Sequence, residues 1–191
     1  MPGTGTSRRI AVVGSAGAGK TTLAQRLGER LGLPHVELDA LFWGPDWTPA
    51  PRDLFREKVG RALAGAAWAT DGNYSAARDI VWGRADTLVW LDYALPLVLW
   101  RVTRRTLRRA LTGQVLWSGN QERLRNALLS NDSLILYALR THHRRRRDYA
   151  RLCRQPEYAH LDVIRLRAPR ETRRWLQSLP RAQTEPEDRS P

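Results

Sequence analysis

The chain has 191 residues, and 42% of them are apolar, which is enough to bury one core of ordinary domain size. We therefore expect one folded domain over residues 1–179 and a disordered tail at residues 180–191, where Pro, Glu, Asp and Arg dominate. No uncharged apolar run approaches the roughly 18 residues that a membrane span needs. The N-terminal residues also lack the apolar segment of a signal peptide, so we expect no membrane partner.

Arginine supplies almost all of the formal net charge of +13, because Lys20 and Lys58 are the only lysines. Excess positive charge favours polyanions such as nucleotides, nucleic acids and phosphorylated metabolites. The alternative is that most arginines cover a solvated surface. The single cysteine, Cys153, excludes an internal disulfide and fits a reducing compartment, so we expect a cytoplasmic protein.

The first elements in chain order are a strand, a glycine-rich loop and a helix. Residues 8–14 form a short apolar run that ends in glycine, which is typical of a buried strand feeding a turn. Residues 20–31 carry leucines at helical spacing, and Gly32 follows as a stop signal. The sequence therefore predicts a strand, a loop and a helix over residues 8–31.

Strands and helices alternate through the rest of the chain. Further strands are expected at residues 35–39, 67–70, 87–91 and 160–166. Further helices are expected at residues 52–64, 96–111, 121–154 and 169–179, with a break at residues 113–120. This alternation predicts an α/β fold with a parallel sheet covered by helices on both faces, in three layers.

The loop between the first strand and helix matches the phosphate-binding pattern G-x-x-x-x-G-K-[ST]. Its candidate nucleotide-binding residues are Gly14, Ser15, Ala16, Gly17, Ala18, Gly19, Lys20, Thr21 and the following Thr22. Glycines let successive backbone N–H groups point at phosphate oxygens, and the helix N-terminus adds its positive end. Lys20 is expected to reach the β- and γ-phosphates, and the Thr21 hydroxyl is expected to bind Mg²⁺.

Three acidic residues lie at or just after predicted strand ends, where open α/β sheets bind their ligands. Asp71, followed by Gly72, is the preferred second partner for Mg²⁺; an ordinary Asp-Gly turn is the alternative. Asp92 is the other candidate, or else a helix-capping residue. Asp39 is expected to face the phosphoryl acceptor, as a hydrogen-bond acceptor or a general base.

Aromatic residues and arginines complete the predicted site. Residues 41–47 carry Phe42, Trp43 and Trp47, which could form a wall against the acceptor or cover the end of the core. Arg101 and Arg105 lead a basic helical face and are the preferred candidates for stabilising charge on the moving phosphoryl group. The arginine run at residues 144–147 could close over phosphates or form a solvated helix end.

Together these residues resemble bacterial P-loop proteins known as topology modulation proteins, which are described as adenylate-kinase-like. The resemblance rests on residues 14–21, 38–39, 71–75, 88–92 and 99–105. It implies the nucleoside-monophosphate-kinase fold, with a five-stranded sheet in the order 2-3-1-4-5 and an arginine-bearing lid, here about residues 100–154. It also implies that Asp71 serves Mg²⁺ and that Arg78 holds an acceptor phosphate.

The leading functional hypothesis is a kinase that uses ATP and Mg²⁺ to phosphorylate a small molecule, possibly a nucleotide or nucleoside. A different class remains open: a nucleotide-dependent regulatory protein that binds nucleic acid through its arginines and hydrolyses ATP slowly. A third reading is a nucleotide-binding module without catalysis. No motif reads guanine or a DNA groove, and the acceptor is not identified by the sequence.

Overall fold

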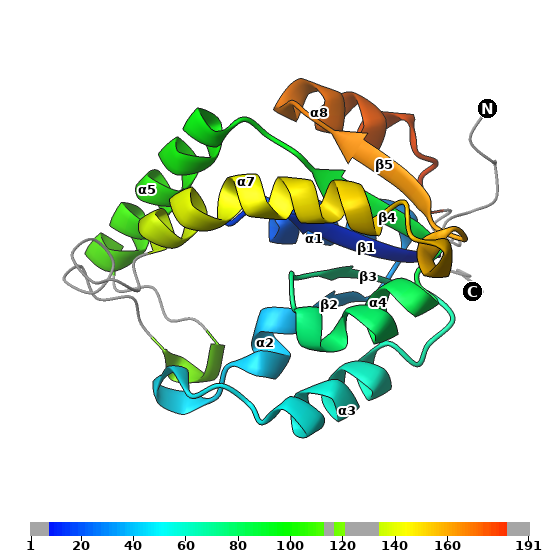
Figure 1. The fold of residues 1–191 in the computed structure, drawn as a ribbon, viewed down its shortest axis with the longest axis horizontal. Coiled ribbons are helices and arrows are strands. Elements are labelled where there is room, and N and C mark those ends of the chain that lie inside the picture. The colour runs from blue at the N-terminus through cyan, green and yellow to red at the C-terminus, as the bar shows by residue number, and fades with distance from the viewer. Residues whose placement is uncertain (1–7, 113–116, 121–133, 183–191) are drawn as a thin grey trace, which may run out of the picture.

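Five parallel strands form one sheet in the computed structural model, which describes residues 8–112, 117–120 and 134–182 (Figure 1). The strands are β1 (Arg9–Gly14), β2 (His35–Glu37), β3 (Trp68–Asp71), β4 (Thr87–Leu91) and β5 (Asp162–Leu166). Their order across the sheet is β2-β3-β1-β4-β5, which confirms the order that the resemblance implies. The strand that feeds the glycine-rich loop is therefore central, with β3 on one side and β4 on the other.

Helices cover both faces of this sheet (Figure 1). They are α1 (Lys20–Leu31), α2 (Leu38–Phe42), α3 (Arg52–Ala62), α4 (Arg78–Arg84), α5 (Leu95–Thr112), α7 (Leu134–Leu152) and α8 (Pro169–Ser178). Short 3₁₀ turns are η1 (Pro45–Trp47), η2 (Ser75–Ala77), η3 (Trp117–Gly119) and η4 (Pro156–Tyr158). Within the described ranges, every helix is too short or too polar to cross a membrane.

Alternate residues of β1 supply the two halves of the core. Ile10 and Val12 pack with α1, α5 and α8 on one face of the sheet. Ala11 and Val13 pack with α3, α4 and the C-terminal half of α7 on the other face. Both faces of β1 are buried from Ile10 onward, and residues 10–14 are accordingly apolar, whereas Arg9 at the start of the strand is exposed. The loop that follows is therefore held by a buried central strand.

The predicted second strand is two residues too long. β2 ends at Glu37, and α2 begins at Leu38, so Asp39 lies in the first turn of a short helix and not at a strand end. β2 ends at Glu37 because its pairing partner ends there. Glu37 is opposite Asp71, the last residue of β3, and β3 is followed by a turn at Gly72, whose φ is 152°. Beyond Glu37, β2 has no ladder partner in β3.

One observed helix was missed by the sequence analysis, and two predicted segments lie partly outside the described residues. Helix α4 was not predicted, because its seven residues include Gly83 and show too little periodicity to be recognised. The helix predicted over residues 121–154 is observed as α7, and residues 121–133 lie outside the described residues. Of the predicted tail, residues 180–182 are described, and the Ala182 amide donates to the carbonyl oxygen of Arg30.

Candidate active site

The glycine-rich loop, Gly14–Thr21, is called the P-loop below and connects β1 to α1 as predicted. Gly17 and Gly19 have φ angles of 78° and 95°, a backbone conformation that L side chains rarely adopt. Gly17 also has no room for a side chain, because a Cβ atom there would lie 2.3 Å from Cγ2 of Val102. The loop conformation therefore depends on glycine and on the packing of α5 against it.

Lys20 lies folded back across the P-loop, with Nζ 3.3 Å from the carbonyl oxygen of Ser15. Burial lowers the pKa of its ammonium group to about 8, although the carboxylates of Asp71 and Asp39 act in the opposite direction. Arg145 and Arg105 lower that pKa further by charge repulsion. The lysine is thus surrounded by charges of both signs at the place where phosphate oxygens are expected.

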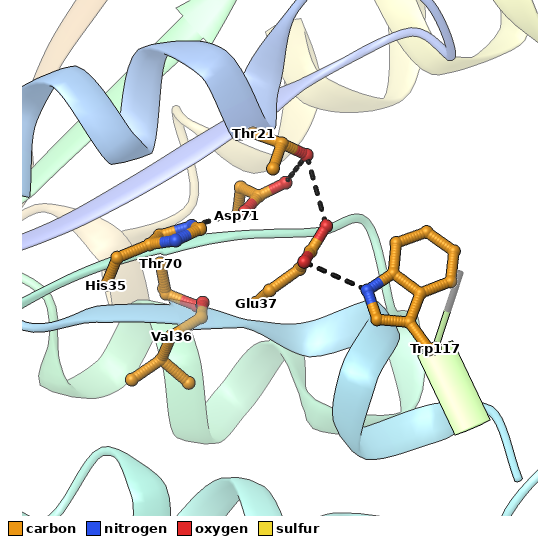
Figure 2. Close-up of polar contacts among 7 residues, drawn as sticks. All are labelled: Thr21, His35, Val36, Glu37, Thr70, Asp71 and Trp117. Atoms are coloured by element: carbon orange, nitrogen blue, oxygen red, sulfur yellow. Dashed lines mark hydrogen bonds and ion pairs between the residues drawn. The ribbon is translucent and has the colours of Figure 1, made fainter. Parts of the chain in front are cut away.

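Thr21 and Asp71, the two residues predicted to bind Mg²⁺, are in contact at the carboxyl ends of the strands. The Thr21 hydroxyl donates to Oδ2 of Asp71 at 2.7 Å, and Asp71 is 3% exposed (Figure 2). The contact follows from topology, because β3 is the neighbour of β1 and Val12 is paired with Asp71. His35, on β2, holds the other carboxylate oxygen, with Nε2 2.9 Å from Oδ1 of Asp71.

Glu37 is a site residue that the sequence reasoning missed. Its Oε1 lies 3.5 Å from Oγ1 of Thr21, and its Oε2 accepts a hydrogen bond from the Trp117 indole N–H at 2.9 Å (Figure 2). Burial raises the pKa of this carboxyl, the Trp117 hydrogen bond lowers it, and nearby Asp71 and Asp39 raise it. The available signal was an acidic side chain inside the predicted strand at residues 35–39, two positions before Asp39.

The Thr21 hydroxyl and the carboxylates of Asp71 and Glu37 form a set of oxygen donors only. Hard cations such as Mg²⁺ prefer oxygen ligands, so the chemistry of this set fits the predicted metal. Asp71 and Glu37 are called the acidic pair below. His35 and Trp117 stand outside the pair, each bonded to one of its carboxylates.

Asp92, the other candidate for the metal, is held elsewhere. It is buried, and its Oδ2 accepts hydrogen bonds from Nε and Nη2 of Arg165 at 2.9 and 2.6 Å. Its Oδ1 forms an ion pair with Nε of Arg146 at 3.1 Å. Asp92 therefore joins the end of β4 to β5 and α7, and the preference for Asp71 as the P-loop partner agrees with this geometry.

Asp39 is bonded to an aromatic side chain, and its predicted role toward an acceptor remains a prediction. The Tyr74 hydroxyl donates to Oδ1 of Asp39 at 2.5 Å, and both burial and this carboxylate raise the pKa of Tyr74 well above its ordinary value. Phe42 packs against Tyr74 with ring centroids 4.6 Å apart. Tyr74 was not among the predicted site residues, although Asp39 and the aromatic segment were.

Residues 117–120, which are distant in sequence, contact this aromatic segment. The Asn120 side chain accepts from the backbone N–H of Trp47 at 3.0 Å and donates to the carbonyl oxygen of Gly44 at 2.9 Å. Trp117 contacts Trp47 edge to face, with ring centroids 6.3 Å apart. This part of the predicted lid is thus fastened to the candidate acceptor side through η1, and Figure 1 shows the two turns side by side.

The predicted arginines lie beside the P-loop. Nη1 of Arg101 donates to the carbonyl oxygen of Ala18 at 3.1 Å, and its guanidinium stacks 5.3 Å from the ring centroid of Tyr93. Arg105 lies one turn further along α5 and, with Arg145 of α7, is close enough to affect Lys20. Arg145 is therefore a candidate from the 144–147 run, because its charge acts on the P-loop lysine as that of Arg105 does.

Helix α7 docks on the P-loop and on the loop after β3. His142 Nδ1 lies 3.0 Å from Oγ of Ser15, and the Tyr149 hydroxyl donates to Oδ1 of Asn73 at 2.8 Å. Asn73 in turn donates to the carbonyl oxygen of Gly14 at 2.6 Å. Thr22, which was also predicted to bind nucleotide, is exposed in the first turn of α1.

Arg78 begins helix α4 and is partly buried. Its guanidinium lies 5.7 Å from the ring centroid of Trp82. Burial raises the pKa of Tyr149 and of Tyr158, and the charge of Arg78 partly offsets that rise. It thus lies near the loop that holds Asn73, as an acceptor-side arginine should. Its binding of an acceptor phosphate remains a prediction.

Similar solved structures are described as kinases. Shikimate kinase from Bacteroides thetaiotaomicron is 18% identical, with a TM-score of 0.50 over 89% of this chain and 94% of that chain. A gluconokinase from Sinorhizobium meliloti 1021 is also 18% identical, with a TM-score of 0.50 over 90% of this chain and 93% of that chain. No protein-family model matches, and no curated protein matches. The comparisons therefore establish the P-loop kinase fold, and the topology modulation family is not confirmed.

Proposed function

We propose that this chain is an ATP-dependent kinase that transfers the γ-phosphoryl group to a small-molecule acceptor. The observation that carries the proposal is the arrangement of Lys20, Thr21 and Asp71 at the P-loop with Asp39 on the same rim. A nucleotide-binding module alone would not need a second carboxylate outside the phosphate cradle. The descriptions of the two similar structures as kinases of small molecules support the same reaction class.

The P-loop would hold the triphosphate through its backbone N–H groups and through Lys20, whose charge balances the β- and γ-phosphates. The Thr21 hydroxyl and the acidic pair would hold Mg²⁺, which supplies neutralisation of phosphate charge when it is bound. Arg101, Arg105 and Arg145 would stabilise the charge that spreads over the moving phosphoryl group.

The acceptor would lie between Asp39 and the P-loop. In the transfer, an acceptor oxygen forms a bond to the γ-phosphorus, and the bond from that phosphorus to the bridging oxygen of ADP breaks. Asp39 would accept the proton from the acceptor hydroxyl, or position that hydroxyl by a hydrogen bond. The Tyr74 hydroxyl, which donates to Asp39 at 2.5 Å, would fix the carboxylate for this role.

A role on nucleic acid gains no specific support from the site. Several arginines of the basic helices are used within the protein: Arg101 donates to the P-loop and Arg146 pairs with Asp92. Arg147 and Arg144 are exposed on α7, where a polyanion could meet them, although Arg144 also forms an ion pair with Asp148 at 3.6 Å. A titration of DNA binding against salt concentration would test that alternative directly.

The proposed function can be tested by measuring ADP release with nucleoside monophosphates, nucleosides and phosphorylated or hydroxylated metabolites as acceptors. One class should stimulate ADP release above background, and Lys20→Ala should abolish both ATP binding and the stimulated turnover. Normal circular dichroism of the variant would confirm that the fold is intact. Undiminished nucleotide affinity in that folded variant would refute the P-loop assignment, and background turnover with every acceptor would favour a binding module.

A further inference from the structure

Each carboxylate of the acidic pair is bonded on its outer side by a ring N–H group (Figure 2). His35 Nε2 holds Oδ1 of Asp71 at 2.9 Å, and Trp117 Nε1 holds Oε2 of Glu37 at 2.9 Å. The remaining oxygens, Oδ2 of Asp71 and Oε1 of Glu37, both face the Thr21 hydroxyl, at 2.7 and 3.5 Å. The two carboxylates are therefore fixed in matching orientations.

The strand register creates this arrangement. His35 and Glu37 are alternate residues of β2, so their side chains lie on the same face of the strand, and Glu37 is paired with Asp71 of β3. The Thr70 hydroxyl donates to the carbonyl oxygen of Val36 at 2.7 Å, which secures the backbone between the two residues. Asp71 is thus flanked by a histidine and a glutamate from the neighbouring strand.

Trp117 comes from a distant part of the chain. Its turn is held by the Asn120 side chain, and the Ser118 hydroxyl donates to the carbonyl oxygen of Trp43 at 2.8 Å. The orientation of Glu37 at the P-loop therefore depends on contacts made on the acceptor side, where Trp43 lies. The position of His35 is set differently, because His35 belongs to β2 and is held by the pairing of β2 with β3.

We infer that His35 and Trp117 are positioning residues for the metal-binding carboxylates, with His35 orienting Asp71 and Trp117 orienting Glu37 toward Thr21. This inference rests on the proposed function, in which these oxygens hold Mg²⁺ beside the nucleotide. Groups that orient metal ligands in this way change metal affinity when they are removed, typically by about 10- to 100-fold. Within the described residues, the side-chain hydrogen bonds of His35 and Trp117 go to these two carboxylates, so metal-free nucleotide binding should not depend on either residue.

The test compares ADP binding with and without Mg²⁺ by calorimetry, so it needs neither an acceptor nor turnover. His35→Leu should reduce the gain in ADP affinity that Mg²⁺ provides by about ten-fold. Affinity measured in EDTA should stay at the wild-type value. His35→Gln keeps an N–H donor and should recover most of the gain, whereas a purely structural role would leave the two variants alike.

Trp117→Phe keeps the ring and removes the indole N–H, so it tests the other half of the inference independently. It should also weaken the Mg²⁺-dependent part of ADP binding. His160→Leu and Trp100→Phe are matched controls, because His160 contacts the carbonyl oxygen of Trp82 and Trp100 is exposed on α5. Thermal unfolding of each variant would show whether a loss of affinity reflects a loss of fold.

The inference would be overturned if His35→Leu and Trp117→Phe retained the full Mg²⁺ effect of their controls while remaining folded. Two other outcomes would distinguish a failure of this inference from a failure of the proposed function. If the wild-type protein bound ADP with no dependence on Mg²⁺, the metal role of Thr21 and Asp71 would be wrong, and the positioning role would fall with it. If Mg²⁺-dependent binding were normal but no acceptor stimulated turnover, only the proposed kinase activity would fail.

Discussion

His142 Nδ1 lies 3.0 Å from Oγ of Ser15, so helix α7 touches the P-loop through a buried polar contact. The same helix pairs Arg146 with Asp92 and bonds Tyr149 to Asn73, three contacts from one side of α7. The P-loop, the end of β4 and the loop after β3 are therefore all fastened to one helix. A substitution that breaks any of these three contacts should therefore alter the position of the P-loop or of the residues beside it.

Acidification should weaken this attachment through His142. Burial lowers the pKa of His142, and neighbouring His143 lowers it further, against the effect of Asp92. As the pH falls, the His142 imidazole is therefore protonated in the unfolded chain before it is protonated in the folded protein. The contribution of neutral His142 to folding stability is complete above pH about 6.5 and is lost as the pH falls from there. His142→Gln should show a smaller loss of unfolding free energy than the wild type between pH 7.5 and 5.5 in urea titrations.

His160→Gln provides the control for that comparison, because His160 contacts a backbone carbonyl far from the P-loop. It measures how far the replacement of a histidine by glutamine elsewhere in the chain changes the pH dependence by itself. If the unfolding free energies of the wild type and His142→Gln fell equally between pH 7.5 and 5.5, the contact between His142 and Ser15 would not depend on pH.

Nucleotide affinity should fall as pH rises above about 8. The pKa of Lys20 is lowered to about 8 by burial, so the free protein loses this charge in weakly alkaline solution. Bound phosphates favour the charged lysine and raise its pKa, so binding at pH 8.5 should be accompanied by proton uptake. Calorimetry in buffers of different ionisation enthalpy measures that uptake; its absence, with affinity constant from pH 7 to 9, would contradict the prediction.

Asp71→Asn and Asp92→Asn should produce different defects. Asp71→Asn removes the charge beside Thr21, so turnover and Mg²⁺-dependent nucleotide binding should fall far more than Mg²⁺-free binding. Asp92→Asn leaves Arg146 and Arg165 without their anion, so it should reduce the unfolding free energy, by about 2 kcal/mol given that both arginines are partly exposed. If only Asp92→Asn abolished Mg²⁺-dependent binding, the two roles would be reversed.

Asp39→Ala should spare ATP binding and impair acceptor use. Its carboxylate is bonded to Tyr74 rather than to the P-loop, so the loss should appear in kcat/KM for a true acceptor. The loss should be on the order of 10² or more for a general base and smaller for a positioning role. Tyr74→Phe, which removes the hydrogen bond to Asp39, should give a milder loss. Weakened ATP affinity in Asp39→Ala with normal acceptor dependence would place this residue on the nucleotide side.

Gly17→Ala should disturb the P-loop by steric conflict. The added Cβ would lie 2.3 Å from Cγ2 of Val102 and 3.0 Å from the carbonyl oxygen of Val98, at a φ of 78°. We expect a loss of about 1–3 kcal/mol in unfolding free energy together with weakened nucleotide binding. Gly83→Ala is the control, because a Cβ there meets nothing within 4 Å in helix α4, and it should be neutral or slightly stabilising.

The sequence by itself determined the elements that are decided locally. The apolar strand, the glycines and Lys20 and Thr21 are contiguous, so their pattern specifies the P-loop and the helix that follows. β4 begins and ends where the sequence predicts, because a strand that is buried on both faces is apolar at almost every position and is therefore visible as a run. The aspartate that closes β3 was also visible, since strand ends in a parallel sheet meet on one edge.

Only the tertiary structure decided which distant side chains complete the site. Glu37 reaches Thr21 because β2 pairs with β3 in one particular register, and Trp117 reaches Glu37 because its turn docks on η1. Asp92 also follows a predicted strand, yet its carboxylate is bound by two arginines from other elements, whereas that of Asp71 is bound by Thr21. Pairing register and ion-pair partners arise from contacts between segments far apart in the chain, and no local pattern of residue types encodes those contacts.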